Sequence, residues 1–481
     1  MLSYTINLGC MNLLESKSKI LFIVSGLVLF IIAVYRASTL SMTHDESSSI
    51  LRLLHENNFT HLFSDKEWLT ANNHWLNTLS FQIFYQVFGM NELALRMGSV
   101  LMMPIYTYAI YFIFKKMDVD FYIQILGVGL LMTNAILLDY FSLARGYAMS
   151  ITFMLTAICF ALKYLENQDN KILLGFAVSL LLSTMSIFSN IIFFFVFSGA
   201  LGIILLRSKK LTKSFFIILL GVFVLMVILT YIPLQTLSKA EEFKWGTNTL
   251  MESFQSYFTS FVHHQKYLFS PDVLIGIFMT IILMAVVSSF MHFFQNSNTL
   301  KEQFFIFIGL SFTIFMFGMI FAKIVLKANY PIDRKCLIYL PFIGLLITLY
   351  ADLYLNKSLK IILGILIGGF LIVHSYHSIN KNSTWEWWYD TYTKELVAEL
   401  ENRTSDAPLK VNSHWMFHPT LDFYNHFFYK DKLILSPYSK DLTVDESIDY
   451  YIIFKGDFEP FKEKYEIISE QLNSQVLIKK K

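Results

Sequence analysis

The sequence predicts an all-α polytopic membrane protein that carries a small C-terminal α/β domain outside the membrane. The 481 residues are 55% hydrophobic and 17% aromatic but only 15% charged, whereas a soluble chain carries about 25% charged residues. Apolar stretches of about 20 residues, the length that crosses a bilayer, recur along the chain. The last segment differs, because 30 of the 74 charged residues lie between Lys381 and Lys481.

The composition also excludes several classes of protein. So many apolar and aromatic side chains do not fit a water-soluble enzyme, a disordered chain or a fibre. The formal net charge of +2 argues against a nucleic-acid partner. The three cysteines, Cys10, Cys159 and Cys336, lie too far apart to suggest a disulfide framework or a zinc site.

Eleven stretches are expected to span the membrane. They are residues 20–40, 93–114, 121–139, 143–163, 171–187, 190–206, 213–233, 272–294, 303–322, 335–355 and 359–378. The 35 uncharged residues between Lys171 and Arg207 would form a helix of about 52 Å, which is too long for one span. We therefore expect a break at Ser186–Asn190. The apolar stretch 76–89 is too short to span and is expected to lie in the interface.

Lysines and arginines set the expected orientation. Under this count the residues between alternate spans, such as Lys115, Lys116 and the cluster from Arg207 to Lys213, fall on one side, which is then the cytoplasm. The N-terminus is expected to be cytoplasmic, and the first apolar stretch is expected to anchor the chain in the plasma membrane. The connections 41–92 and 234–271 lie outside. The chain divides into a transmembrane domain, 1–379, and an extracytoplasmic domain, 380–481.

An acidic motif follows the first expected span on the outer side. In Thr43-His44-Asp45-Glu46 a carboxylate can take a proton from a hydroxyl group or hold a divalent cation. Low-dielectric surroundings would raise its pKa toward the range useful for a base. Thr43 and Glu46 also have the spacing of a helix-capping box. The two interpretations are compatible, because a capped helix would hold Asp45 rigidly.

Two further outer segments carry polar residues. His74 could bind a phosphate or a metal, or it could be an amphipathic anchor beside Trp75. Asp139 and Arg145 flank a short turn between two spans. They could pair with each other, or they could point a carboxylate and a guanidinium into a shared cavity.

Cations on the outer side oppose the usual inside bias. They fit either an anionic ligand or lipid headgroups. They are Lys239, Lys244, His263, His264 and Lys266 in one loop, and Lys323, Lys327, Arg334 and Lys335 before the tenth span. Arg96, at the start of the second span, is expected to be a snorkelling or helix-locking residue rather than a ligand. His374-x-x-His377 has metal-ligand spacing but no carboxylate nearby on its face.

Four segments together resemble the GT-C sugar transferases. The resemblance is to glycosyltransferase family 39 and its bacterial relatives, which include protein O-mannosyltransferases, the lipid A aminoarabinose transferase and Rgt-type transferases. It covers roughly the first 165 residues, with a weaker match at Arg334 and Pro341. The segments are His44-Asp45-Glu46, Asn73-His74-Trp75-Leu76, the stretch Glu92–Ser99 and Ala144-Arg145-Gly146-Tyr147. The second is usually richer in proline, and the third has Gly98 where proline is frequent.

The resemblance implies a sugar donor on a polyprenyl phosphate and inverting transfer at the outer face to a lipid, polysaccharide or protein of the cell envelope. Asp45 would be the base, with Glu46 or Asp139 orienting it, the acceptor or a cation. Arg145, with one or more of Lys266, Arg334 and Lys335, would neutralise the phosphate, and His74 and His264 would complete the substrate site. No metal is expected to be obligatory, and a divalent cation is left open.

The C-terminal domain is expected to contain a helix at Tyr392–Asn402 and strands at Leu433–Leu435 and Tyr450–Phe454. Trp385-Glu386-Trp387-Trp388 suggests an aromatic belt or, alternatively, a sugar-stacking surface. A transporter or flippase for a lipid-linked or anionic solute is the main alternative function. Transporters place charges at mid-membrane in broken helices, whereas the charges here gather at the ends of the spans.

Overall fold

A computed structural model describes residues 2–54, 74–239, 241, 244–262, 270–295, 299–403 and 408–481. Within these residues, nine helical stretches are long and apolar enough to cross a membrane. They are formed by α1 (Leu2–Thr39), α4 with α5 (Glu92–Val100, Met102–Lys116), α8 (Gly146–Asn167), η2 with α10 (Phe188–Asn190, Ile191–Arg207), α11 (Lys213–Lys239), α13 (Pro271–Phe294), α14 (Leu300–Val325), η4 with α15 (Asp333–Ile338, Tyr339–Tyr354) and α16–η5–α17 (Lys357–Ile362, Leu363–Gly368, Gly369–Ser378).

Each of the eleven expected spans has a helical counterpart, but two of them are not full-length straight helices. Helices α6 (Phe121–Met132) and α7 (Ala135–Phe141) meet at 63° and are long and apolar enough to cross a membrane only when they are taken together. The bend follows from Asn134, whose side chain accepts the Leu137 amide hydrogen and starts a new helix. Helix α9 (Asn170–Ser186) has only 17 residues, which makes it shorter than a typical span.

The expected break after Ser186 is confirmed. Helix α9 ends at Ser186, and the short 3₁₀ helix η2 precedes α10. The Asn190 side chain donates to Ser183 Oγ at 3.1 Å and also bonds Ser150. These buried contacts fix the turn, so the uncharged stretch folds as a hairpin.

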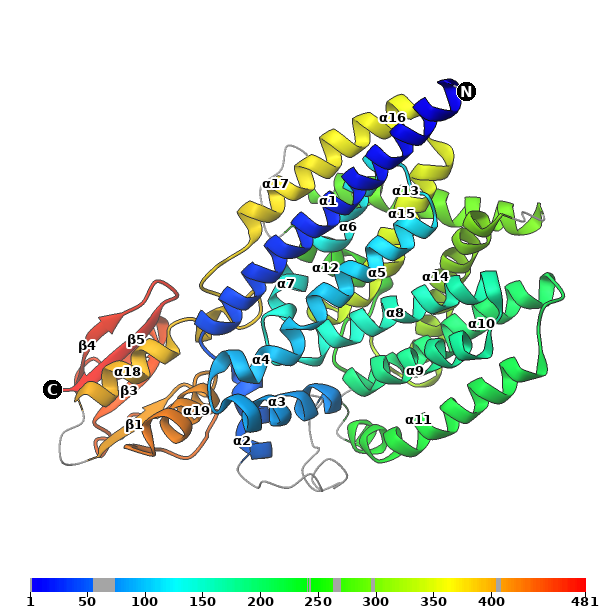
Figure 1. Ribbon diagram of the computed structural model, residues 1–481. Helices are drawn as coiled ribbons and strands as arrows, with labels where there is room; N and C mark the ends of the chain where they lie inside the picture. Colours follow the sequence, from blue (N-terminus) through cyan, green and yellow to red (C-terminus); the bar gives the residue numbers. More distant parts are fainter. Residues whose placement is uncertain are drawn as a thin grey trace. The chain divides into compact units, whose positions relative to one another are not determined.

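The chain divides into two compact units. The first contains Met1–Ala33, Phe63–Asn77 and Gly98–Ile379, and so holds most of the spans. Within it α8 packs against α9 and α5, and α10 packs against α14 (Figure 1). Phenylalanines fill the space between helices, as in the stacked rings of Phe315 and Phe342, whose centroids are 5.4 Å apart.

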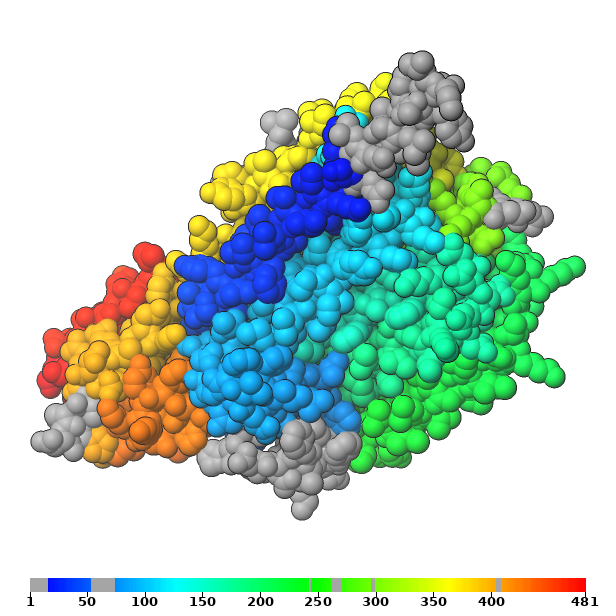
Figure 2. Space-filling model, in the orientation of Figure 1, coloured from blue at the N-terminus to red at the C-terminus, as the bar shows by residue number. Residues whose placement is uncertain are grey.

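Helices α1 and α5 lie side by side on one face of this unit (Figure 2). Gly26 allows the approach, because a Cβ there would lie 2.7 Å from Thr107 Cγ2. A groove of about 480 Å³ runs between them, with Phe22 and Tyr108 among its lining residues. The apolar and partly exposed side chains here are those expected of a surface that faces lipid.

The second unit contains Val34–Leu62, Thr78–Met97 and Asn380–Lys481. The first unit ends at Ile379, and two N-terminal segments that were expected in the transmembrane domain group with the C-terminal part. The unit holds α2 (His44–Leu54), most of α3 (Trp75–Phe88), α18 (Thr393–Arg403), β1 (Leu409–Ser413), α19 (His418–Tyr429), β2 (Leu433–Leu435), β3 (Tyr450–Phe454), β4 (Tyr465–Glu470) and β5 (Gln475–Lys480). Helix α12 (Leu250–Val262) belongs to the first unit.

A five-stranded sheet forms the centre of the C-terminal part, with the order β2-β1-β3-β5-β4. Strand β1 pairs in parallel with β2 and β3, whereas β5 pairs antiparallel with β3 and β4. The helix and both strands expected from the sequence are confirmed as α18, β2 and β3. Helix α19 packs against α2 and α18.

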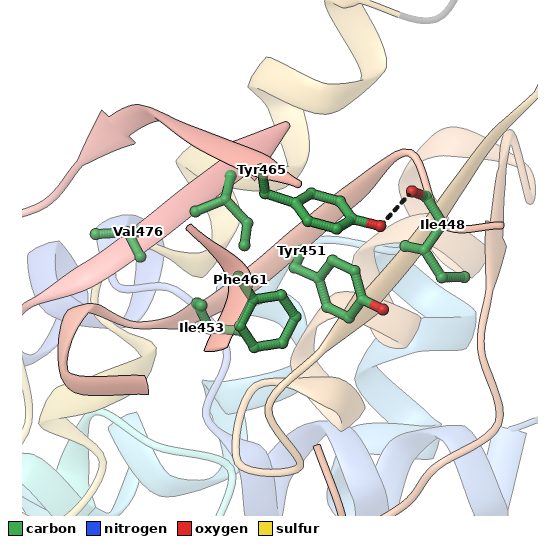
Figure 3. Packing of buried hydrophobic residues seen from close by; sticks show 7 residues of the cluster. Ile448, Tyr451, Ile453, Phe461, Tyr465 and Val476 are labelled. Atoms are coloured by element: carbon green, nitrogen blue, oxygen red, sulfur yellow. Dashed lines mark hydrogen bonds between the residues drawn. The ribbon is translucent and has the colours of Figure 1, made fainter. Parts of the chain in front are cut away.

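A buried aromatic cluster stabilises one side of this sheet (Figure 3). Tyr451 and Tyr465 meet edge to face with their ring centroids 5.2 Å apart, and Phe461 packs against both. The Tyr465 hydroxyl donates to the Ile448 carbonyl at 2.9 Å. The C-terminal part thus has an apolar core of its own.

Candidate functional site

The acidic motif starts helix α2, as the capping box predicts. The Thr43 amide donates to Glu46 Oε2 at 3.0 Å, and the Glu46 amide donates to Thr43 Oγ1 at 3.4 Å. The box satisfies two backbone N–H groups at the helix start. Asp45 lies in the first helical turn and is 8% exposed. Its backbone is therefore rigidly placed.

Arg96 holds Glu46 in a buried ion pair within the same unit. Arg96 Nε donates to Glu46 Oε1 at 2.9 Å, and Arg96 Nη2 donates to Oε2 at 2.7 Å. The same guanidinium donates to the carbonyls of Ala37, Leu40 and Ser41 at the end of α1. The helix-locking role expected of Arg96 is confirmed. The contacts favour a structural role for Glu46 over its suggested role in orienting Asp45, the acceptor or a cation.

A second carboxyl group lies beside the motif, and sequence reasoning missed it. Asp390 is 1% exposed, and its Oδ2 accepts the His44 amide hydrogen at 2.6 Å. Burial raises the pKa of Asp390 well above its usual value and the charge of Asp45 adds to this, while hydrogen bonds from His44, Thr420 and Thr393 oppose it. No local signal could have found this residue, because it lies 346 positions from His44.

The first unit contains a buried histidine just before α3. His74 Nδ1 donates to the Ser186 carbonyl at 3.1 Å, and the ring meets the edge of Tyr147 at 5.4 Å. Gly146 permits this packing, because a Cβ there would collide with the Ser186 carbonyl and lie 2.9 Å from His74 Cβ. The glycine of the Arg145-Gly146-Tyr147 segment therefore has a steric reason.

Two arginines act on His74. Burial first, and then the positive charges of Arg145 and Arg334, lower the pKa of His74 well below its usual value. The ring is therefore neutral, and the Nδ1–H that bonds Ser186 leaves a lone pair on Nε2. Within the described residues His74 Nε2 has no hydrogen-bond partner. An open polar atom thus lies in the field of two guanidinium groups, which together favour an anion.

Local contacts place Arg145 as well. Arg145 is 1% exposed and directly precedes α8. Its carbonyl accepts the Ser99 hydroxyl at 3.1 Å, and the Asn77 amide donates to the neighbouring Ala144 carbonyl at 2.8 Å. Two side chains of the first unit therefore fix the backbone that carries this arginine.

The other predicted site residues are distributed as follows. Asp139 is 8% exposed in α7 of the first unit. Lys335 Nζ donates to the Trp245 carbonyl at 3.0 Å in the same unit. His264 and Lys266 lie outside the described residues. The structure thus gathers His74, Arg145 and Arg334 in the first unit, and Asp45 and Glu46 with Asp390 in the second.

No group of three His, Cys, Asp or Glu side chains suited to a metal ion occurs in the part of the chain that the structure describes. The carboxyl groups of Asp45 and Asp390 are two oxygen ligands of the kind that a hard cation uses. The second unit has carboxyl groups suited to proton transfer, and the first unit has cationic groups suited to anion binding.

No family model and no curated protein matches the sequence. Among solved structures, ArnT from Cupriavidus metallidurans bound to undecaprenyl phosphate is similar over 95% of this chain and 97% of that chain, at 11% identity and a TM-score of 0.46. The apo state of ArnT gives a TM-score of 0.44 at the same identity and coverage. Arabinofuranosyltransferase AftD from Mycobacteria matches over 82% of this chain and 29% of its own, at 8% identity and a TM-score of 0.37.

Proposed function

We propose that this chain is a membrane glycosyltransferase that moves a sugar from a polyprenyl-phosphate donor to a cell-envelope acceptor. The observation that carries the proposal is the open Nε2 of buried His74 in the field of Arg145 and Arg334. The two guanidinium groups suit a phosphate, and the spans of the same unit suit a lipid-borne one. The motif resemblance to GT-C enzymes supports the same donor.

The proposed reaction is a single displacement with inversion. The acceptor oxygen attacks the anomeric carbon as the bond from that carbon to the phosphate oxygen breaks. The leaving phosphate gains charge and needs electrostatic stabilisation rather than a strong acid. Arg145 and Arg334 supply that charge, and His74 can take up a proton when the anion binds next to it.

Asp45 is the proposed base for the acceptor hydroxyl. Its backbone is fixed by the capping box, and its buried side chain lies close enough to Asp390 for the two carboxyl groups to interact. The positive-inside bias supports chemistry on the outer face of the plasma membrane. The acceptor class is a lipid, polysaccharide or protein.

The test is transfer by the purified full chain with a panel of polyprenyl-phosphate sugars. We expect Asp45→Asn to lower transfer by at least about 100-fold, because general-base catalysis contributes 10²–10⁴-fold. The matched control is Asp441→Asn, an exposed acid of the second unit, which should keep transfer unchanged. Near-normal transfer by Asp45→Asn would remove Asp45 as the base. Movement of the lipid-linked sugar across vesicles without any transfer would support the transporter alternative instead.

A further inference from the structure

An aromatic cluster of the second unit surrounds His44, the residue before Asp45. His44 Nδ1 lies 2.9 Å from the Met416 carbonyl oxygen. The His44 ring meets Trp415 at 5.9 Å and an interplanar angle of 85°. The loop between β1 and α19 is thus tied to the start of α2, and it brings Trp415 next to the acidic motif.

Trp415 is not a core residue. Its side chain is partly exposed, and Lys440 Nζ lies 5.8 Å from the centre of its ring. His418 meets Tyr438 with ring centroids 5.7 Å apart, and Tyr438 is 49% exposed. Aromatic residues that only fill a core are buried. The rings of Trp415 and Tyr438 are instead partly exposed to solvent, and the cation Lys440 lies near Trp415.

The polar groups of the cluster differ in charge. Burial raises the pKa of Tyr438, while the nearby charge of Arg52 opposes this shift. Burial and the neighbouring His44 lower the pKa of His418. His418 is therefore neutral near pH 7 and can donate or accept a hydrogen bond, whereas Arg52 and Lys440 can only donate.

We propose that Trp415, His418, Tyr438 and Lys440, called here the Trp415 cluster, form a binding subsite for an anionic saccharide. Aromatic faces pack against the apolar C–H face of a sugar ring, a neutral imidazole bonds its hydroxyl groups, and the cations attract a phosphate or carboxylate substituent. The position next to Asp45 makes the saccharide the acceptor. The assignment of the saccharide as the acceptor rests on the proposed function, whereas the proposal that the cluster binds an anionic saccharide does not.

Binding can be measured without any transfer. The probes are glucose 6-phosphate, glucuronate, glucose and inorganic phosphate, added to the full chain in detergent, with affinity read by saturation-transfer NMR. We expect the two anionic sugars to bind more tightly than both glucose and inorganic phosphate. Trp415→Ala should weaken the binding of the two anionic sugars by about tenfold. Lys440→Gln should remove the preference for the anionic sugars over glucose.

Matched controls come from the same unit. Phe427→Ala removes a partly exposed aromatic ring that packs on Phe423, and Lys432→Gln removes a lysine that pairs with Glu401. Neither should change probe affinity. The proposal is overturned if no sugar binds, if inorganic phosphate binds as well as glucose 6-phosphate, or if the controls lose as much affinity as Trp415→Ala. Asp45→Asn should bind the probes like the wild type. The binding assay therefore tests the Trp415 cluster independently of the transfer assay, which tests the proposed enzyme function.

Discussion

Among single residues, Arg334 and Lys335 are adjacent in the sequence but differ in their contacts. Arg334 acts on the buried His74, whereas the Lys335 ammonium donates to the Trp245 carbonyl. Hydrogen bonds to charged groups contribute about 1.5–3 kcal/mol. We therefore expect Arg334→Ala to weaken polyprenyl-phosphate binding by roughly tenfold to 100-fold, measured by titration in nanodiscs.

Lys335→Ala is the control for this prediction. It should change the affinity much less, because the ammonium of Lys335 already has a carbonyl partner. Equal losses in the two variants would indicate a general effect of positive charge on lipid binding. Unchanged affinity in Arg334→Ala would discard its phosphate role.

His74 gives the molecule a pH dependence of known sign. The unfolded chain protonates this histidine near pH 6.5, whereas burial and two arginines lower its pKa in the folded state. The unfolded state therefore binds more protons below pH 6.5. Stability from neutral His74 is fully present above that pH and is lost progressively as the pH falls from there toward the lower pKa of the folded state.

His74→Gln isolates this contribution from other titrating groups, such as Asp390, whose raised pKa acts in the opposite direction. In thermal unfolding, the advantage of the wild type over His74→Gln should shrink between pH 7.5 and pH 5.5. His377→Gln changes an exposed histidine and serves as the control. A constant advantage across this pH range would contradict a neutral, buried His74.

At the level of elements, Arg96 joins the end of α1 to the start of α2. Its guanidinium donates hydrogen bonds to three backbone carbonyls and to both carboxylate oxygens of Glu46. The side chains of Arg96 and Glu46 are both 0% exposed. Removing one partner of a buried pair leaves an uncompensated charge, which costs about 3–5 kcal/mol. Arg96→Ala should therefore lower the free energy of unfolding by about that amount in denaturant titrations.

Arg403→Ala is the surface counterpart, since Arg403 pairs with Glu399 at 2.8 Å while 39% exposed. Exposed pairs contribute about 0–1 kcal/mol, so this variant should unfold nearly as the wild type does. A similar loss in both variants would mean that the Arg96 pair has no special role.

Elements with a local signal could be predicted, and those without one could not. The break at Ser186–Asn190 follows from helix length, and β2 and β3 follow from short apolar runs between polar residues. The bend between α6 and α7 was missed, because the uncharged run continues through Thr133 and Asn134. Its cause is the capping bond of Asn134, which depends on backbone geometry rather than on composition.

For the whole molecule, the sequence separates a membrane part from a polar tail but does not reveal which segments fold together. Tyr424 shows why. Its hydroxyl donates to Glu92, and it accepts the Met42 amide hydrogen, in contacts that join distant segments in one unit. Composition and spacing describe neighbours along the chain, so such contacts have no local signature. The base candidate Asp45 was found from its motif, whereas Asp390 needed the structure.

Asp390 makes the C-terminal segment part of the proposed chemistry. Its side chain accepts the His44 amide hydrogen at 2.6 Å and so fixes the backbone next to Asp45. Asp390→Ala removes this acceptor, and a misplaced base should lower kcat by about tenfold or more. Donor affinity should stay within about twofold, because the variant leaves the cations of the first unit intact.

Asp390→Asn separates positioning from charge, since its side-chain oxygen can still accept the His44 amide hydrogen. It should keep most of the transfer activity, with gel filtration and circular dichroism confirming that both variants fold. Asp431→Ala, which removes an acid that is 61% exposed, is the matched control and should behave like the wild type. If Asp390→Ala keeps full kcat, the C-terminal segment does not position the base. If it loses donor affinity as much as kcat, the defect is general rather than local to Asp45.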